Sequence, residues 1–190
     1  MKKMLYPALI ILALIGLPVH AANYVIDTEK AHAFIEFKIS HLGFSFVKGR
    51  FNSFSGEFSY DENDPSASKV SVNIDTSSID TNYAERDKHL KSADFLDVSK
   101  YPTATFTSTS FKELGNGKAR LSGNLTLHGV TKPIMIDVTE VGAGKDPWGG
   151  YRRGFTGVTT LKLKDFGIDY NLGPASTEVE IQLSLEGIRK

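Results

Sequence analysis

The sequence contains no cysteine among its 190 residues. This absence excludes disulfides, thiolate metal sites and a cysteine nucleophile. It also excludes a lipid-modified N-terminal cysteine, so we expect the mature protein to be soluble. The sequence also has no excess of positive or negative charge, because its 22 Lys and Arg residues balance its 22 Asp and Glu residues. The chain therefore has no basic excess for binding nucleic acid or an anionic membrane.

The N-terminal apolar run, residues 8–17, is too short to span a bilayer, so stable membrane insertion is not expected. Lys2 and Lys3 precede the run, Pro18 ends it, and Val19-His20-Ala21 is a plausible cleavage site. We therefore predict that residues 1–21 are a signal peptide. Residues 22–190 then form one exported domain, which loses two lysines on processing and carries a formal charge of −2.

Catalytic patterns are also missing. The sequence has no Gly-x-Ser-x-Gly nucleophile elbow and no glycine-rich phosphate loop between a strand and a helix. Glu85 and His89 have the i, i+4 spacing of a metal pair, but no third ligand accompanies them. We therefore expect no enzymatic activity, no catalytic residue, no metal site and no cofactor.

Apolar residues alternate with polar ones in about eight segments, the pattern of antiparallel strands with one face in water. The segments are residues 35–39, 54–60, 70–74, 103–107, 121–127, 134–138, 155–163 and 179–186. Turn signals such as Gly115-Asn116-Gly117 separate them. The pattern predicts an all-β domain that closes into a barrel or forms a sandwich.

An eight-stranded barrel is just wide enough to be packed solid or to hold one ligand. Four glycines fall at positions expected to face inward, where they would leave room: Gly49, Gly56, Gly123 and Gly157. The alternative is that these glycines mark bends or bulges. Together with the 12 phenylalanines, they favour an apolar cavity.

One short segment has a helical pattern instead. Asn82 and Glu85 have the spacing of a capping box, and they predict a helix over residues 83–91. One face of this helix would carry four side chains: Tyr83, Arg86, Asp87 and Leu90. Charges on such a face indicate that the helix covers a cavity mouth. We expect Arg86 and Asp87 to form a partly buried ion pair, and the alternative is that Arg86 meets a polar ligand head.

Several motifs occur in the order found in the YceI-like family. They are His41-Leu42-Gly43, Gly49-x-Phe51-x-x-Phe54-x-Gly56, Glu85-Arg86-Asp87-x-His89-Leu90 with Asp94-Phe95, Tyr101-Pro102 with Phe106, the run 123–131, and Asp165-Phe166-Gly167-Ile168. The sequence resembles this family over the whole expected mature chain. One difference is Leu96, where many members carry a second Phe, and it bears on the shape of the pocket.

The resemblance implies an extended, lipocalin-like, eight-stranded antiparallel barrel with the helical insert near its mouth. It also implies a periplasmic protein, without established enzymatic activity, that encloses an isoprenoid lipid or a quinone tail for transport, storage or buffering. A homodimer is a possible further partner. On this basis the ligand-binding residues are expected to be Ile35, Phe37, Ile39, His41, Val72, Ile74, Arg86, Asp87, Leu90, Phe95, Phe106, Leu125, Leu127, Phe155, Leu161 and Phe166.

Three alternatives remain open at this point. The ligand could be a fatty acid or a fatty amide, because apolar burial discriminates weakly between chains of similar girth. The protein could be an enzyme acting on isoprenoid lipids through Arg86, Asp87 and His89. It could also be an interaction module with a solid core.

Overall fold

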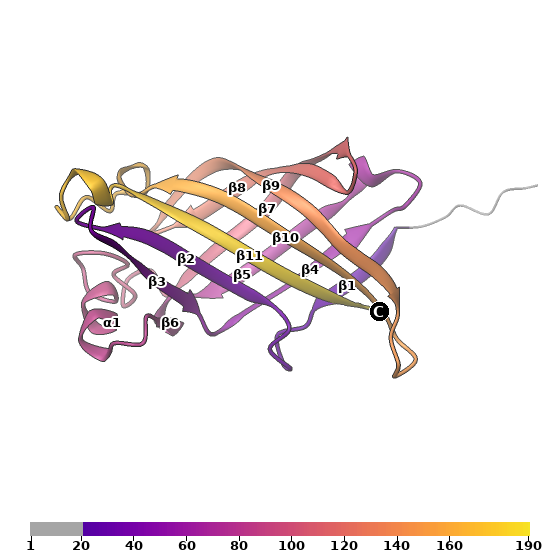
Figure 1. Cartoon of the computed structure of the whole chain (residues 1–190), viewed down its shortest axis with the longest axis horizontal. Coiled ribbons are helices and arrows are strands. Elements are labelled where there is room, and N and C mark those ends of the chain that lie inside the picture. Colours follow the sequence, from indigo (N-terminus) through magenta and orange to yellow (C-terminus); the bar gives the residue numbers. More distant parts are fainter. Residues whose placement is uncertain (1–20) are drawn as a thin grey trace, which may run out of the picture.

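The computed structural model describes residues 21–190 (Figure 1). The predicted signal peptide lies outside the described residues except for Ala21. The strands are β1 (Ala22–Ile26), β2 (Phe34–His41), β3 (Ser45–Phe51), β4 (Phe54–Tyr60), β5 (Lys69–Asp75), β6 (Ile79–Asp80), β7 (Thr103–Gly115), β8 (Lys118–Leu127), β9 (Val130–Lys145), β10 (Tyr151–Lys162) and β11 (Glu178–Arg189). The α-helix is α1 (Ala84–Leu90), and short 3-10 helices are η1 (Pro65–Ala67), η2 (Thr76–Ser78), η3 (Leu163–Phe166) and η4 (Pro174–Ser176).

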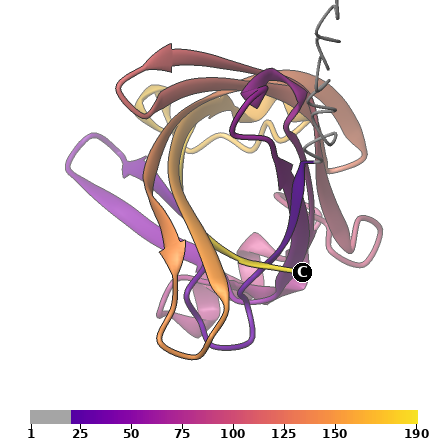
Figure 2. The same ribbon diagram turned by 90° about the vertical axis from the view of Figure 1, so that its right-hand side faces the viewer.

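Eight antiparallel strands close into a ring, in the order β1-β4-β5-β7-β8-β9-β10-β11, and β11 pairs back onto β1. Figure 2 shows this ring end-on. Closure leaves no free sheet edge around the ring, which suits a chain rich in strands. The predicted all-β, eight-stranded antiparallel barrel is confirmed.

One of the eight segments predicted from alternation is not part of the closed ring. The segment at residues 35–39, part of β2, was expected among the eight, but β1 takes that place in the ring. Both strands lie along the same edge of β11: β1 pairs with Gly187–Arg189 and β2 pairs with Val179–Ser184. With β3 and β6, β2 therefore extends the barrel wall at the end where α1 lies (Figure 1).

The inward glycines do not leave empty space, which corrects the expectation drawn from them. A Cβ atom on Gly123 would lie 2.3 Å from Cζ of Phe106, and one on Gly49 would lie 2.4 Å from Cζ of Phe37. Gly123 and Gly49 each accommodate an aromatic ring from the neighbouring strand, an arrangement that stabilises glycine in sheets, whereas a Cβ atom on Gly56 or Gly157 would meet aliphatic side chains. Side chains from other strands, phenylalanine rings among them, therefore fill the space beside these glycines.

The helix also begins later than predicted. Asn82 has a φ of 61°, and Tyr83 is the N-cap residue, without a side-chain capping bond. The capping box between Asn82 and Glu85 was wrong, because Asn tolerates the left-handed conformation and here uses it to turn the chain into the helix. The helix lies at the same end of the barrel as the tip of the β2–β3 hairpin (Figure 1).

Candidate ligand-binding cavity

The barrel encloses a cavity of about 480 Å³, within the range of small-molecule binding sites. Its lining is almost entirely apolar, and no carboxylate of residues 21–190 is part of it. The polar side chains that line it are Ser40, His41, Arg86, His89, Thr159 and Ser176. Such a lining favours an apolar ligand that carries at most a small polar group.

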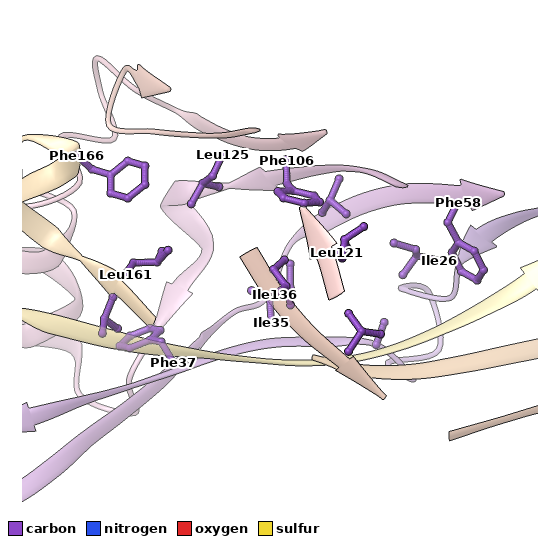
Figure 3. Packing of buried hydrophobic residues seen from close by; sticks show 14 of the residues in the cluster. Ile26, Ile35, Phe37, Phe58, Phe106, Leu121, Leu125, Ile136, Leu161 and Phe166 are labelled. Carbon is purple, nitrogen blue, oxygen red and sulfur yellow. The ribbon is translucent and has the colours of Figure 1, made fainter. Parts of the chain in front are cut away.

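Most of the predicted ligand-binding residues line this cavity. They are Ile35, Phe37, Ile39, His41, Val72, Ile74, Arg86, Leu90, Phe95, Phe106, Leu125, Leu127 and Leu161. Figure 3 shows several of them along the interior, with Phe37 and Leu161 from one side and Leu125 and Phe106 from the other. The alternation of apolar residues therefore identified the inner face of the wall.

Three of the predicted residues lie elsewhere. The carboxylate of Asp87 accepts a hydrogen bond from the backbone N–H of Thr81, just before α1. Phe166 is packed in the core at 2% exposure, and its carbonyl oxygen accepts a hydrogen bond from Nδ1 of His128 at 3.0 Å. Phe155 lines a separate pocket of about 60 Å³ at the opposite end of the barrel. A period of two identifies a face of a strand but not a position along the barrel axis, so Phe155 could not be distinguished from the cavity residues.

An aromatic cluster closes the barrel at the end where Phe155 lies. The ring of Phe155 is 5.8 Å from that of Phe58 and 5.9 Å from that of Tyr60. The guanidinium of Arg153, a buried residue, lies 4.1 Å from the Tyr60 ring centroid. Burial, and the hydrogen bond donated to Glu113, raise the pKa of Tyr60 to about 12. Aromatic rings therefore occupy most of this end and leave only the pocket of about 60 Å³, whereas the larger cavity extends toward α1.

At the α1 end, Thr81 holds the two charged residues that were expected to pair. Nε of Arg86 donates to Oγ1 of Thr81, and Nη2 donates to its carbonyl oxygen, both at 2.8 Å. The carboxylate of Asp87 accepts hydrogen bonds from the backbone N–H and the hydroxyl of the same residue. No ion pair joins Arg86 to Asp87 in the described part of the chain, so that prediction was wrong. A threonine six residues before Asp87 bridges both charges instead.

His89 lines the cavity beside this anchor. Its Nε2 lies 2.9 Å from Oδ2 of Asp94, and its ring makes edge contacts with Phe95 and Tyr170 at centroid distances of 5.0 and 5.2 Å. The expected helix at the cavity mouth is thus in place, with Arg86, His89 and Leu90 facing the cavity. Arg86 and His89 belong to the polar part of the lining, together with Ser40, His41, Thr159 and Ser176.

One group of side chains among the described residues has the spacing of metal ligands: Asp27, His32 and Glu186. None of them lines the cavity, and Nη1 of Arg152 already donates to Asp27 at 2.8 Å and to Glu186. Burial opposes ionisation of Asp27, but the hydrogen bonds from His32 and Arg152 outweigh it and lower its pKa. The guanidinium therefore supplies the positive charge of this cluster.

Sequence reasoning missed the part of the lining contributed by the chain between β10 and β11 and by β11 itself. These residues are Leu163, Ile168, Leu172, Ser176, Val179, Ile181, Leu183 and Leu185. The alternation over residues 179–185 would have found the last four. Ile168 and Leu172 lie in irregular backbone, so no period marks them.

The fold and the site define the protein as a closed antiparallel barrel around an apolar cavity. Comparison with known proteins agrees with this class. Residues 24–187 match the YceI-like domain. A UPF0312 protein of Shewanella baltica strain OS195 is 59% identical over 191 residues, covering 100% of both chains. The chain belongs to the YceI-like family.

Solved structures show the same fold. The YceI protein of Campylobacter jejuni is 32% identical, and the match covers 80% of this chain and 91% of that chain with a TM-score of 0.71. A polyisoprenoid binding domain from Saccharophagus degradans is 19% identical, covers 90% and 100% of the two chains, and has a TM-score of 0.65. Within residues 21–190, no helix has the length and apolar character needed to cross a bilayer.

Proposed function

We propose that this chain is a periplasmic binding protein that encloses a long apolar chain, an isoprenoid lipid or a quinone tail, for transport, storage or buffering. The observation that carries the proposal is the cavity of about 480 Å³ with its almost wholly apolar lining. Burial of an apolar chain contributes about 0.8 kcal/mol per CH₂ group, so such a cavity binds without specific polar chemistry. The polyisoprenoid binding of the Saccharophagus degradans domain supports the same ligand class.

The polar part of the lining suits a ligand with one polar end. Arg86 is held by two hydrogen bonds to Thr81 and still lines the cavity, and His89 lines it from the same helix. We propose that a ligand head lies near these two side chains and that its tail points toward Phe106. The protein is proposed to release its ligand unchanged, as a binder rather than an enzyme. Export to the periplasm is supported by the basic and apolar segments at the start of the sequence.

Mass spectrometry of lipid extracted from the purified protein tests this function. Ala104 is 3% exposed and lines the cavity, so Ala104→Phe places a ring where the ligand tail would lie. Displacing only two CH₂ groups should weaken the affinity for the lipid by about tenfold, and less lipid should then be extracted. Thr107→Phe is the matched control, since Thr107 is exposed on the same strand.

The outcomes separate the alternatives. An isoprenoid or quinone that is lost in Ala104→Phe and kept in Thr107→Phe supports the proposal. A fatty acid or fatty amide with the same pattern would replace the ligand class, and a chemically altered lipid would show turnover. Wild-type protein without any lipid would contradict the function itself.

A further inference from the structure

The tip of the β2–β3 hairpin exposes three large apolar side chains to solvent. Leu42 is 55% exposed, Phe44 is 89% exposed and Phe46 is 64% exposed. The tip lies at the same end of the barrel as α1 (Figure 1). Leu42 also lines the cavity, so the exposed apolar surface of the tip is continuous with the cavity lining.

The tip is held rigidly in spite of its exposure. The backbone N–H of Phe44 donates to the carbonyl oxygen of His41 at 2.9 Å, and that of Gly43 donates to Oγ of Ser40. The hydroxyl of Ser176, in η4, donates to the carbonyl oxygen of Ser40 at 2.7 Å. The apolar side chains are thus displayed on a fixed turn.

Leu42, at the turn, adopts a backbone conformation that is unfavourable for leucine. Leu42 and Gly43 have φ values of 54° and 81°, a combination of left-handed residues that favours Asn-Gly. The β7–β8 turn of this chain has that pair, with Asn116 and Gly117 at φ values of 52° and 70°. An exposed leucine in a left-handed conformation is a local cost, and such costs are concentrated at functional sites.

One lysine side chain lies over an exposed ring of the tip, and a second lysine is its partner across the hairpin. Nζ of Lys38 lies 5.3 Å from the ring centroid of Phe46 and 3.0 Å from Oε1 of Glu180. Lys48 is paired opposite Lys38 across the hairpin and makes no ion pair with any residue from 21 to 190. Aromatic rings flanked by lysines are the pattern of side chains that lie at a membrane–water interface.

From this arrangement we propose that the tip formed by Leu42, Phe44 and Phe46 docks on the surface of a lipid bilayer, so that the cavity mouth faces the lipid phase. The inference rests on the proposed function, because an insoluble chain needs a route between bilayer and cavity that avoids water. The chain has no net positive charge, so contact has to come from this local patch. Three side chains cover only a few hundred Å². A second copy of the chain would need about 800 Å² per partner, so the patch fits a bilayer surface better than a dimer.

Cosedimentation of the mature protein with vesicles of phosphatidylethanolamine and phosphatidylglycerol tests the docking. Phe44→Ser combined with Phe46→Ser should lower the partition coefficient by about tenfold or more, since neither side chain lines the cavity and only the docking surface is lost. Trp148→Ser combined with Val141→Ser is the matched control. These side chains are 78% and 70% exposed, and Trp148 lies in the β9–β10 loop at the other end of the barrel (Figure 1).

Fluorescence gives a second measurement, because Trp148 is the one tryptophan of the sequence. Vesicles should leave the emission of the wild-type protein unchanged. Phe44→Trp in a Trp148→Phe background should show a blue shift when vesicles are added. Leu42→Asn should weaken vesicle binding while the Tm stays equal to or above that of the wild type, because Asn suits the left-handed turn.

Vesicle binding that is unaffected by the two Phe→Ser changes would overturn the proposal, and so would an equal loss in the Trp148 and Val141 variant. If the Phe→Ser changes abolish a dimer seen by sedimentation velocity and leave vesicle binding intact, the tip is a protein interface. Lipid extracted from the same preparations keeps the two proposals separate. Protein that carries lipid but ignores vesicles refutes the docking, and protein without lipid refutes the binding function.

Discussion

Gly123→Ala should destabilise the barrel and disturb the cavity at the same time. The added Cβ would lie 2.3 Å from Cζ of Phe106 and 2.6 Å from the carbonyl oxygen of Thr107. The ring can move, but the carbonyl oxygen is part of the β7 backbone, so the clash cannot be relieved by a rotamer change alone. Overpacking of this kind costs about 1–3 kcal/mol, and the backbone contact places this case at about 2–3 kcal/mol.

The assays are urea and thermal unfolding, with lipid content as the functional readout. For a domain of this size, 1 kcal/mol corresponds to about 2–4 °C, so the Tm should fall by about 4–12 °C. Phe106 lines the cavity, so a displaced ring should also reduce the amount of bound lipid. Gly142→Ala is the control, because nothing lies within 4 Å of its added Cβ, and its effect should stay within about 0.5 kcal/mol.

A double variant shows whether the added Cβ at position 123 clashes mainly with the Phe106 ring or with the backbone. Phe106→Leu removes the ring atoms closest to Gly123, so combining it with Gly123→Ala should cost less than the sum of the two single changes. If Gly123→Ala is as stable as the wild type, the ring is not pressed against the glycine. Additive costs would show that the carbonyl contact alone accounts for the effect.

Two further predictions concern the polar contacts at the two ends of the barrel. Thr81→Val removes the hydroxyl that bridges Arg86 and Asp87, and it should lower the free energy of unfolding by about 2–3 kcal/mol. Urea titration measures this change, and an unchanged urea midpoint would contradict the role of the hydroxyl. The pKa of Asp27 is lowered in the folded protein, so its ionised form stabilises the fold above its unfolded pKa of about 3.9, and this contribution is lost as the pH falls through the lowered folded value. Asp27→Asn should therefore flatten the decline of stability at acid pH, and an acid profile identical to that of the wild type would refute the role of its bond to Arg152.

Much of the architecture could be read from local pattern alone. Leu121, Leu125 and Leu127 lie on the inner face as their alternation predicts, because successive side chains of a strand point to opposite faces. The helix was also visible locally, since Arg86 and Leu90 are four residues apart and both reach the cavity. These features depend on neighbours within one turn of helix or a few residues of strand.

Other features depend on contacts between distant parts of the chain. Whether β1 or β2 closes the ring is decided by how they share the edge of β11, more than 130 residues away. The alternation pattern marked only β2, because Tyr24, Val25 and Ile26 of β1 are consecutive apolar residues. The glycines looked like open space because the sequence does not show which side chain lies over them, and Phe106 covers Gly123 from a neighbouring strand.

The polar contacts at the cavity mouth were decided in the same way. Adjacent opposite charges at Arg86 and Asp87 suggested a pair, but neighbouring positions on a helix point in different directions. The turn before the helix brings Thr81 between them, and its hydroxyl and backbone satisfy both groups. Period and spacing thus determined the helix and eight strands with their inner faces, but not β1, β3 and β6. The closing strand, the filling of the glycine positions and the partners of buried polar groups arose only when the barrel brought remote residues into contact.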